Sequence, residues 1–96
     1  MIYISGKITN EDKEIQAKNL ARFFEVEKEL GERCINPARH GDSPDRSYES
    51  YVIQDLILIF AHRPELYMMK GWEESRGARL EWELAHQLGL TITYEK

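Results

Sequence analysis

Glu81 is the residue of this chain that most clearly indicates chemistry. In the segment 75–89, Ala78, Trp82 and Ala85 recur at helical spacing and form an apolar stripe, and Glu81 falls on that stripe. A carboxylate that faces a protein core costs free energy unless it has partners or a catalytic task. Glu81 is therefore a candidate catalytic group. The spacing also allows the alternative that Glu81 lies at the margin of the stripe and is solvated.

A turn suited to an anion precedes this carboxylate. Ser75 and Gly77 open the same predicted helix, whose first backbone N–H groups and positive dipole end would favour a phosphate. Gly77 would let the anion approach the backbone closely. The alternative is that Ser75 is simply an N-cap and Gly77 a residue that packs tightly.

The elements that would position these residues alternate between strands and helices. The sequence predicts strands at 2–4, 33–36, 66–69 and 91–94, helices at 11–30, 47–61 and 75–88, and a loop at 38–47. Strands that alternate with helices imply a mainly parallel sheet covered on both faces. The predicted fold is a small three-layer α/β sandwich with a sheet of four or five strands, in one domain spanning residues 1–96.

The first helix is the longest predicted element. Asn10 is its expected N-cap, and Gly31 is its expected stop. Apolar residues at helical spacing predict its buried face, which consists of Ala17, Leu20, Ala21 and Phe24, with Phe23 and Leu30 alongside.

Polar residues gather where the predicted strands end. Ser5 and Gly6 end the first strand, Asn36 ends the second, and the third leads toward Ser75. Ligands of parallel sheets bind beyond the carboxyl ends of the strands, so this edge is the expected site. Asp55 lies within an otherwise apolar helix, where it either faces water or points toward the same edge.

Composition excludes several classes of function. The 13 basic residues are scattered, and the net charge is −4, which argues against a nucleic-acid-binding surface. No apolar run has the length of a membrane span, and residues 1–6 read as a strand rather than a signal peptide, so a cytoplasmic protein is expected. Cys34 is the only cysteine, and the three histidines lack metal-ligand spacing. No metal or cofactor is expected.

Three segments together resemble the nucleoside 2-deoxyribosyltransferase-like superfamily, which includes the deoxynucleoside 5′-monophosphate N-glycosidases. Residues 3–8, Tyr-Ile-Ser-Gly-Lys-Ile, resemble its opening strand and loop, and Gln54-Asp55-Leu56 resembles its central Asp-Leu. Ser75-x-Gly77-x-x-x-Glu81 resembles the motif that ends at its catalytic glutamate. The chain is most similar to short bacterial and phage members. The resemblance implies a flavodoxin- or Rossmann-like fold.

The resemblance also implies roles for individual residues. Glu81 would be the nucleophile that attacks the anomeric carbon of a deoxyribose. Asp55 would contact the departing base or help to protonate it, and Tyr3 would orient the Glu81 carboxylate. Ser75 and the Gly77 backbone would hold a 5′-phosphate. Ser5 and Gly6, at the end of the first strand, are further expected substrate-binding residues.

Two classes of function follow, both with a nucleoside or nucleotide as the partner. One is an enzyme that cleaves or exchanges the N-glycosidic bond, and the other is a nucleotide-binding module without turnover. A homodimer is also expected, because members of the superfamily are commonly dimers. In addition, the helix around Tyr51, Ile53, Ile57 and Phe60 has more apolar surface than one sheet face can cover.

Overall fold

The structure is a computed structural model that describes residues 1–31, 33–40 and 48–96. The strands are β1 (Ile2–Ser5), β2 (Cys34–Ile35), β3 (Glu65–Met68) and β4 (Ile92–Tyr94). The helices are α1 (Lys13–Leu30), α2 (Tyr48–His62) and α3 (Arg76–Leu88), with two 3-10 turns, η1 (Pro37–His40) and η2 (Trp72–Glu74). No helix in these three ranges is long and apolar enough to cross a membrane.

The strands form one parallel sheet in the order β2-β1-β3-β4. Tyr3 pairs with Ile35 on one side and with Leu66 on the other, so β1 is a central strand. The chain therefore leaves β1 toward β2 and later returns to add β3 on the opposite side of β1. In parallel sheets, such a reversal opens a crevice at the carboxyl ends of the two strands. The predicted α/β fold is confirmed, with four strands.

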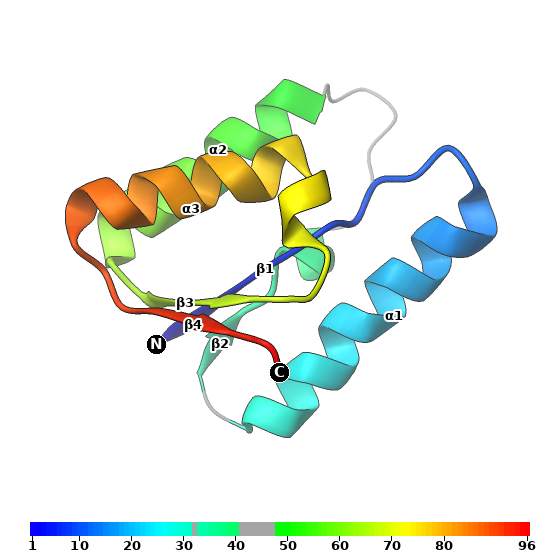
Figure 1. The fold of residues 1–96 in the computed structure, drawn as a ribbon, viewed down its shortest axis with the longest axis horizontal. Coiled ribbons are helices and arrows are strands. Elements are labelled where there is room, and N and C mark those ends of the chain that lie inside the picture. Colours follow the sequence, from blue (N-terminus) through cyan, green and yellow to red (C-terminus); the bar gives the residue numbers. More distant parts are fainter. Residues whose placement is uncertain (32, 41–47) are drawn as a thin grey trace.

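Helices cover both faces of the sheet, with α1 on one face and α2 and α3 on the other (Figure 1). Tyr3, Leu66 and Met68 pack toward the α2 and α3 layer together with Ile59 and Ala85. Ile4 and Met69 pack toward α1 against Phe23 and Val26. Successive side chains of a strand point to opposite faces, so Tyr3 and Ser5 both point toward α3.

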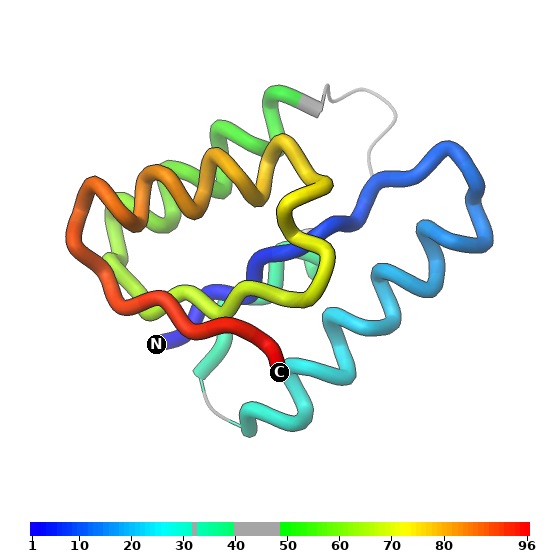
Figure 2. The backbone as a smooth tube through the Cα atoms, viewed as in Figure 1, coloured from blue at the N-terminus to red at the C-terminus, as the bar shows by residue number. Residues whose placement is uncertain are grey.

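The ends of β1 and β3 lie side by side, as the backbone trace in Figure 2 shows. The Met69 N–H donates to the Ser5 carbonyl at 2.8 Å, which joins the two strand ends. A side chain at Gly6 would place its Cβ 3.0 Å from the Met69 Cβ and 3.3 Å from the Phe23 Cζ. Glycine therefore lets the chain turn away from β1 in this crowded corner.

The start of α1 differs from the prediction. Asp12 is its N-cap and accepts hydrogen bonds from the N–H groups of Glu14 and Ile15, so Asn10 as the N-cap was wrong. Asn10 instead accepts a hydrogen bond from the Asp12 N–H in the preceding turn. The predicted stop is confirmed, since Gly31 ends the helix in a left-handed conformation with φ at 61°.

The buried face of α1 was predicted only in part. Phe23 is buried as predicted and Val26 is buried although it was not predicted, whereas Ala17, Ala21 and Phe24 are exposed. The buried and the exposed apolar residues of α1 both have helical spacing, so periodicity alone could not identify the stripe that contacts the sheet. Of the predicted loop 38–47, residues 38–40 belong to η1, and 41–47 lie outside the described residues.

Candidate active site

A buried carboxyl group on α3 lies against two side chains of β1. Glu81 is only 6% exposed, so it faces the interior rather than water. The Tyr3 hydroxyl donates a hydrogen bond to Glu81 Oε2 at 2.7 Å, and the Ser5 hydroxyl donates one to Oε1 at 2.6 Å. Tyr3 and Ser5 are two residues apart on β1, so both side chains point to the same face of the sheet. This one strand therefore supplies a hydrogen-bond donor for each carboxyl oxygen of Glu81. Both donors hold the carboxyl group in one orientation.

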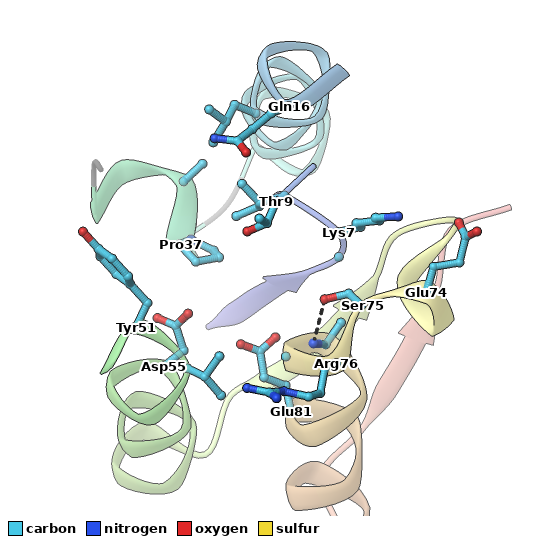
Figure 3. A pocket seen from close by; sticks show the side chains of 17 residues that line it. Lys7, Thr9, Gln16, Pro37, Tyr51, Asp55, Glu74, Ser75, Arg76 and Glu81 are labelled. Atoms are coloured by element: carbon cyan, nitrogen blue, oxygen red, sulfur yellow. Dashed lines mark hydrogen bonds between the residues drawn. The ribbon is translucent and has the colours of Figure 1, made fainter. Parts of the chain in front are cut away.

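Asp55, on α2, belongs to the same site. Its carboxyl group and that of Glu81 both point into one pocket (Figure 3). Burial is the main cause that raises the pKa of Glu81 and that of Tyr3, and the charge of Asp55 raises both further. The sequence left open whether Asp55 faces water or this edge of the sheet, and the structure brings it to the edge.

Burial gives this site unusual proton affinities. Burial raises the pKa of Glu81 from 4.5 to about 8, against the hydrogen bonds from Ser5 and Tyr3, which lower that pKa. The pKa of Tyr3 is raised well above 10.0, first by burial and then by the Glu81 charge. Near neutral pH, Glu81 is therefore mostly protonated in the ligand-free protein, and Tyr3 remains a hydrogen-bond donor.

The pocket above Glu81 has a volume of about 400 Å³, which is large enough for a small-molecule ligand. Its apolar wall consists of Ile8, Leu20, Pro37, Ala38, Tyr51, Val52 and Ala78. Its other lining residues are Gly6, Lys7, Thr9, Gln16, Asp55, Glu74, Ser75, Arg76, Gly77 and Glu81. An apolar wall with a few polar groups suits a flat organic ring that carries polar substituents.

The start of α3 forms one end of this pocket. Ser75 is the N-cap of α3, and its Oγ accepts a hydrogen bond from the Ala78 N–H at 3.1 Å (Figure 3). Ser75 and Gly77 both line the pocket, and no acidic residue lies in the first helical turn. Ser75 is thus an N-cap, as its alternative interpretation held, and it also faces the pocket. The helix terminus provides an electropositive end for an anion.

The candidate residues fall into two groups. Gly6, Asp55, Ser75, Gly77 and Glu81 line the pocket. Tyr3 and Ser5 are fully buried beneath it and act on Glu81 through their hydroxyl groups.

Asn36, the polar residue that ends the second predicted strand, does not line the pocket. Its side chain donates to Glu27 Oε1 and accepts from the Ala38 N–H. These contacts fix η1, whose Pro37 and Ala38 form part of the pocket wall. Asn36 thus supports the pocket from behind.

The sequence interpretation missed several lining residues, among them Lys7, Gln16 and Arg76. Tyr51 was assigned to the outer apolar surface of α2 but lines the pocket. Its spacing of four residues from Asp55, one helical turn, is the signal that could have identified it.

No group of three or more His, Cys, Asp or Glu residues within the described ranges is arranged to hold a metal ion. Comparison with protein families matches residues 1–94 to a family described as a domain of unknown function, DUF4406. No curated protein and no solved structure matches the chain significantly.

Proposed function

We propose that this chain, which belongs to the DUF4406 family of domains of unknown function, cleaves or exchanges the N-glycosidic bond of a deoxynucleoside or its 5′-monophosphate. The observation that carries the proposal is the buried Glu81 carboxyl group, held by Tyr3 and Ser5 at the floor of a pocket that Asp55 shares. The resemblance to nucleoside 2-deoxyribosyltransferase-like proteins supports the same chemistry. An oriented carboxylate is a suitable nucleophile for an anomeric carbon.

In the proposed reaction, the ionised Glu81 attacks the anomeric carbon of the deoxyribose. The bond between this carbon and the base nitrogen breaks, and its electron pair leaves with the base. The product is a glycosyl ester on Glu81, which water hydrolyses or a second base displaces. The hydrogen bonds from Tyr3 and Ser5 keep the carboxylate oriented throughout.

Proton transfer links the two carboxyl groups in this proposal. Glu81 must release its proton before it attacks, because its pKa of about 8 keeps it protonated near neutral pH. Asp55 lies in the same pocket and can accept that proton and pass it to the departing base. The base then leaves as a neutral molecule.

Burial of Glu81 supports an enzyme over a binding module without turnover. A module that only holds a nucleotide has no need for a carboxyl group that is 6% exposed, with its pKa raised to about 8. Perturbed titratable groups in a pocket are more common at catalytic sites.

The proposal is tested by incubating the protein with a panel of nucleosides and 5′-monophosphates and separating the free base by chromatography. Release of base supports the enzyme. Binding of nucleotides in calorimetry without release would favour the binding module, and the absence of both would refute the proposal. Heat-inactivated protein is the control for spontaneous hydrolysis.

Replacement of Ser75 tests the phosphate end of the pocket. Ser75→Ala should weaken the binding of a 5′-monophosphate by about 1–3 kcal/mol more than that of the matching nucleoside, because a hydrogen bond to a charged group is lost. Calorimetric titration of both ligands gives this difference.

Ser75→Asp is the matched control, because aspartate preserves the N-cap but repels an anion. It should weaken monophosphate binding at least as strongly as Ser75→Ala. If Ser75→Asp leaves monophosphate affinity unchanged, Ser75 is only an N-cap.

We also propose a homodimer formed through the outer face of α2 and α3. Ile53, Ile57 and Phe60 are 57%, 61% and 57% exposed, and Leu80 is 43% exposed. With Leu56 and Leu84 they line an apolar groove. Exposed apolar patches of this kind usually mark interaction sites.

Light scattering at micromolar concentration should therefore give the mass of two chains. Ile57→Arg should reduce it to the mass of one chain, because a charge would be buried in the interface. Ile15→Arg, at a 44% exposed isoleucine on α1, should keep the dimer mass. A wild-type mass of one chain would rule out this dimer.

A further inference from the structure

We infer that Gln16 determines which base the site accepts, by donating an amide N–H to an exocyclic carbonyl oxygen of the base. The inference rests on the proposed function, since it assigns the base end of the same pocket. It predicts a preference for bases that carry a carbonyl group over bases that carry an amino group at the equivalent position.

The orientation of the Gln16 amide follows from a backbone contact. Gln16 Oε1 accepts a hydrogen bond from the Asn10 N–H at 3.1 Å. A backbone N–H can only donate, so the atom that faces it must be the amide oxygen. The amide nitrogen, with its two hydrogens, is then the end that remains for a ligand.

Neighbouring contacts keep this donor in place. Asn10 accepts a hydrogen bond from the Asp12 N–H at 2.9 Å, and Asp12 caps α1. One turn further along α1, the Asn19 amide donates to the Ile8 carbonyl at 3.2 Å. The segment between β1 and α1 is thus fastened to the helix that carries Gln16. A donor held in this way discriminates better than a mobile one.

The position of Gln16 fits the base end of the pocket. In Figure 3, Gln16 and Glu81 lie on opposite sides of the pocket, and Pro37 and Tyr51 lie along its wall. If the sugar lies over Glu81 and the phosphate at Ser75, the base is directed toward this apolar wall. A flat ring can pack against Pro37 and Tyr51 while its polar edge reaches Gln16.

Donor and acceptor chemistry then sets the preference. A carbonyl oxygen accepts the Gln16 N–H, whereas an amino group presents a second donor and leaves both groups without a partner. Sites that hydrogen-bond a substrate group reject analogues that leave the site unpaired. We expect the carbonyl base to be favoured by at least about tenfold.

The test uses two pairs of 2′-deoxynucleoside 5′-monophosphates that differ mainly in this group. Hypoxanthine is compared with adenine, and uracil with cytosine. The measured quantity is the ratio of kcat/KM within each pair, or the ratio of dissociation constants if there is no turnover. Wild-type protein should favour hypoxanthine and uracil.

Gln16→Glu is the decisive variant. A glutamate still accepts the hydrogen bond from the Asn10 N–H, but its other oxygen accepts where the amide nitrogen donated. The preference should therefore move toward the amino base by at least about tenfold. Gln16→Ala should bring both ratios close to one.

Gln87→Glu is the matched control. It makes the same change of side chain and charge at an exposed position on α3, and Gln87 does not line the pocket. It should leave the ratios unchanged. If Gln16→Glu also leaves them unchanged while it folds and binds nucleotide, Gln16 only fastens the loop and the inference is wrong. If the wild-type protein binds no nucleotide, the proposed function is wrong as well.

Discussion

Glu81→Ala is expected to reduce base release by at least about 10³-fold, because removal of a nucleophile eliminates the covalent route. Nucleotide binding should largely persist, since the proposed phosphate contacts are at Ser75 and the start of α3, away from the Glu81 carboxyl group. Rates of base release and calorimetric binding of a 5′-monophosphate measure the two effects separately. A variant that retains wild-type activity would disprove the proposed mechanism.

The variant set must separate lost chemistry from lost stability. In Glu81→Ala, the buried hydroxyl groups of Tyr3 and Ser5 lose Glu81 as an acceptor, and a buried group that is left unsatisfied costs about 1–3 kcal/mol. Glu81→Gln retains an acceptor oxygen and the volume of the side chain but is no nucleophile. It should be as inactive as Glu81→Ala and fold better.

The pH profile provides an independent check on the same residue. In the proposed mechanism the proton of Glu81 passes through Asp55 to the departing base, so kcat/KM of the wild-type protein should fall as the pH rises through about 8, where Glu81 loses this proton to solvent. Asp55→Asn should move this midpoint to lower pH, because the Asp55 charge raises the pKa of Glu81. Ser5→Ala should move it to higher pH, because a hydrogen bond that lowers the pKa is lost.

Glu81→Gln is also expected to gain stability relative to the wild type as the pH rises. The pKa of Glu81 is about 8 in the folded protein and ordinarily 4.5. Between these pH values, the folded protein therefore binds more protons than the unfolded chain. The contribution of protonated Glu81 to the free energy of unfolding is therefore fully present below the unfolded pKa, and it is lost as the pH rises through the folded pKa. At about 1.36 kcal/mol for each pKa unit, the upper limit of the loss is about 5 kcal/mol.

Chemical unfolding of both proteins at a series of pH values measures this difference. The difference in the free energy of unfolding between Glu81→Gln and the wild type should increase from about pH 5 to about pH 9. Glu73→Gln, at an exposed glutamate before α3, is the control and should show no such trend. If this difference in the free energy of unfolding does not change with pH, Glu81 ionises in the folded protein at the same pH as in the unfolded chain.

The sequence by itself determined the order of the elements and the class of the fold. Short apolar strands alternate with helices, and local spacing is sufficient to place them, so the parallel α/β sheet was predicted correctly. The same local spacing put Glu81 on the apolar stripe of α3, and the structure confirms its burial. Gly31 marked the end of α1 because a left-handed residue is needed there.

Only the tertiary structure decided which faces meet. On α1, contact with the sheet buried Phe23, which the sequence had predicted, and Val26, which it had not, and left Ala17 and Phe24 exposed. On α2, Tyr51 turned toward the pocket, while Ile53 remained exposed. Periodicity shows that a helix has an apolar face, but packing against distant segments determines its exact boundaries.

The proton affinity of the site also depended on the tertiary structure. Family resemblance suggested that Tyr3 orients Glu81, but the donor from Ser5 was not foreseen. Tyr3 and Ser5 lie 78 and 76 residues from Glu81 in the chain, so no local pattern contains these contacts. The raised pKa of Glu81 arises mainly from burial, and burial is a property of the assembled layers rather than of any segment.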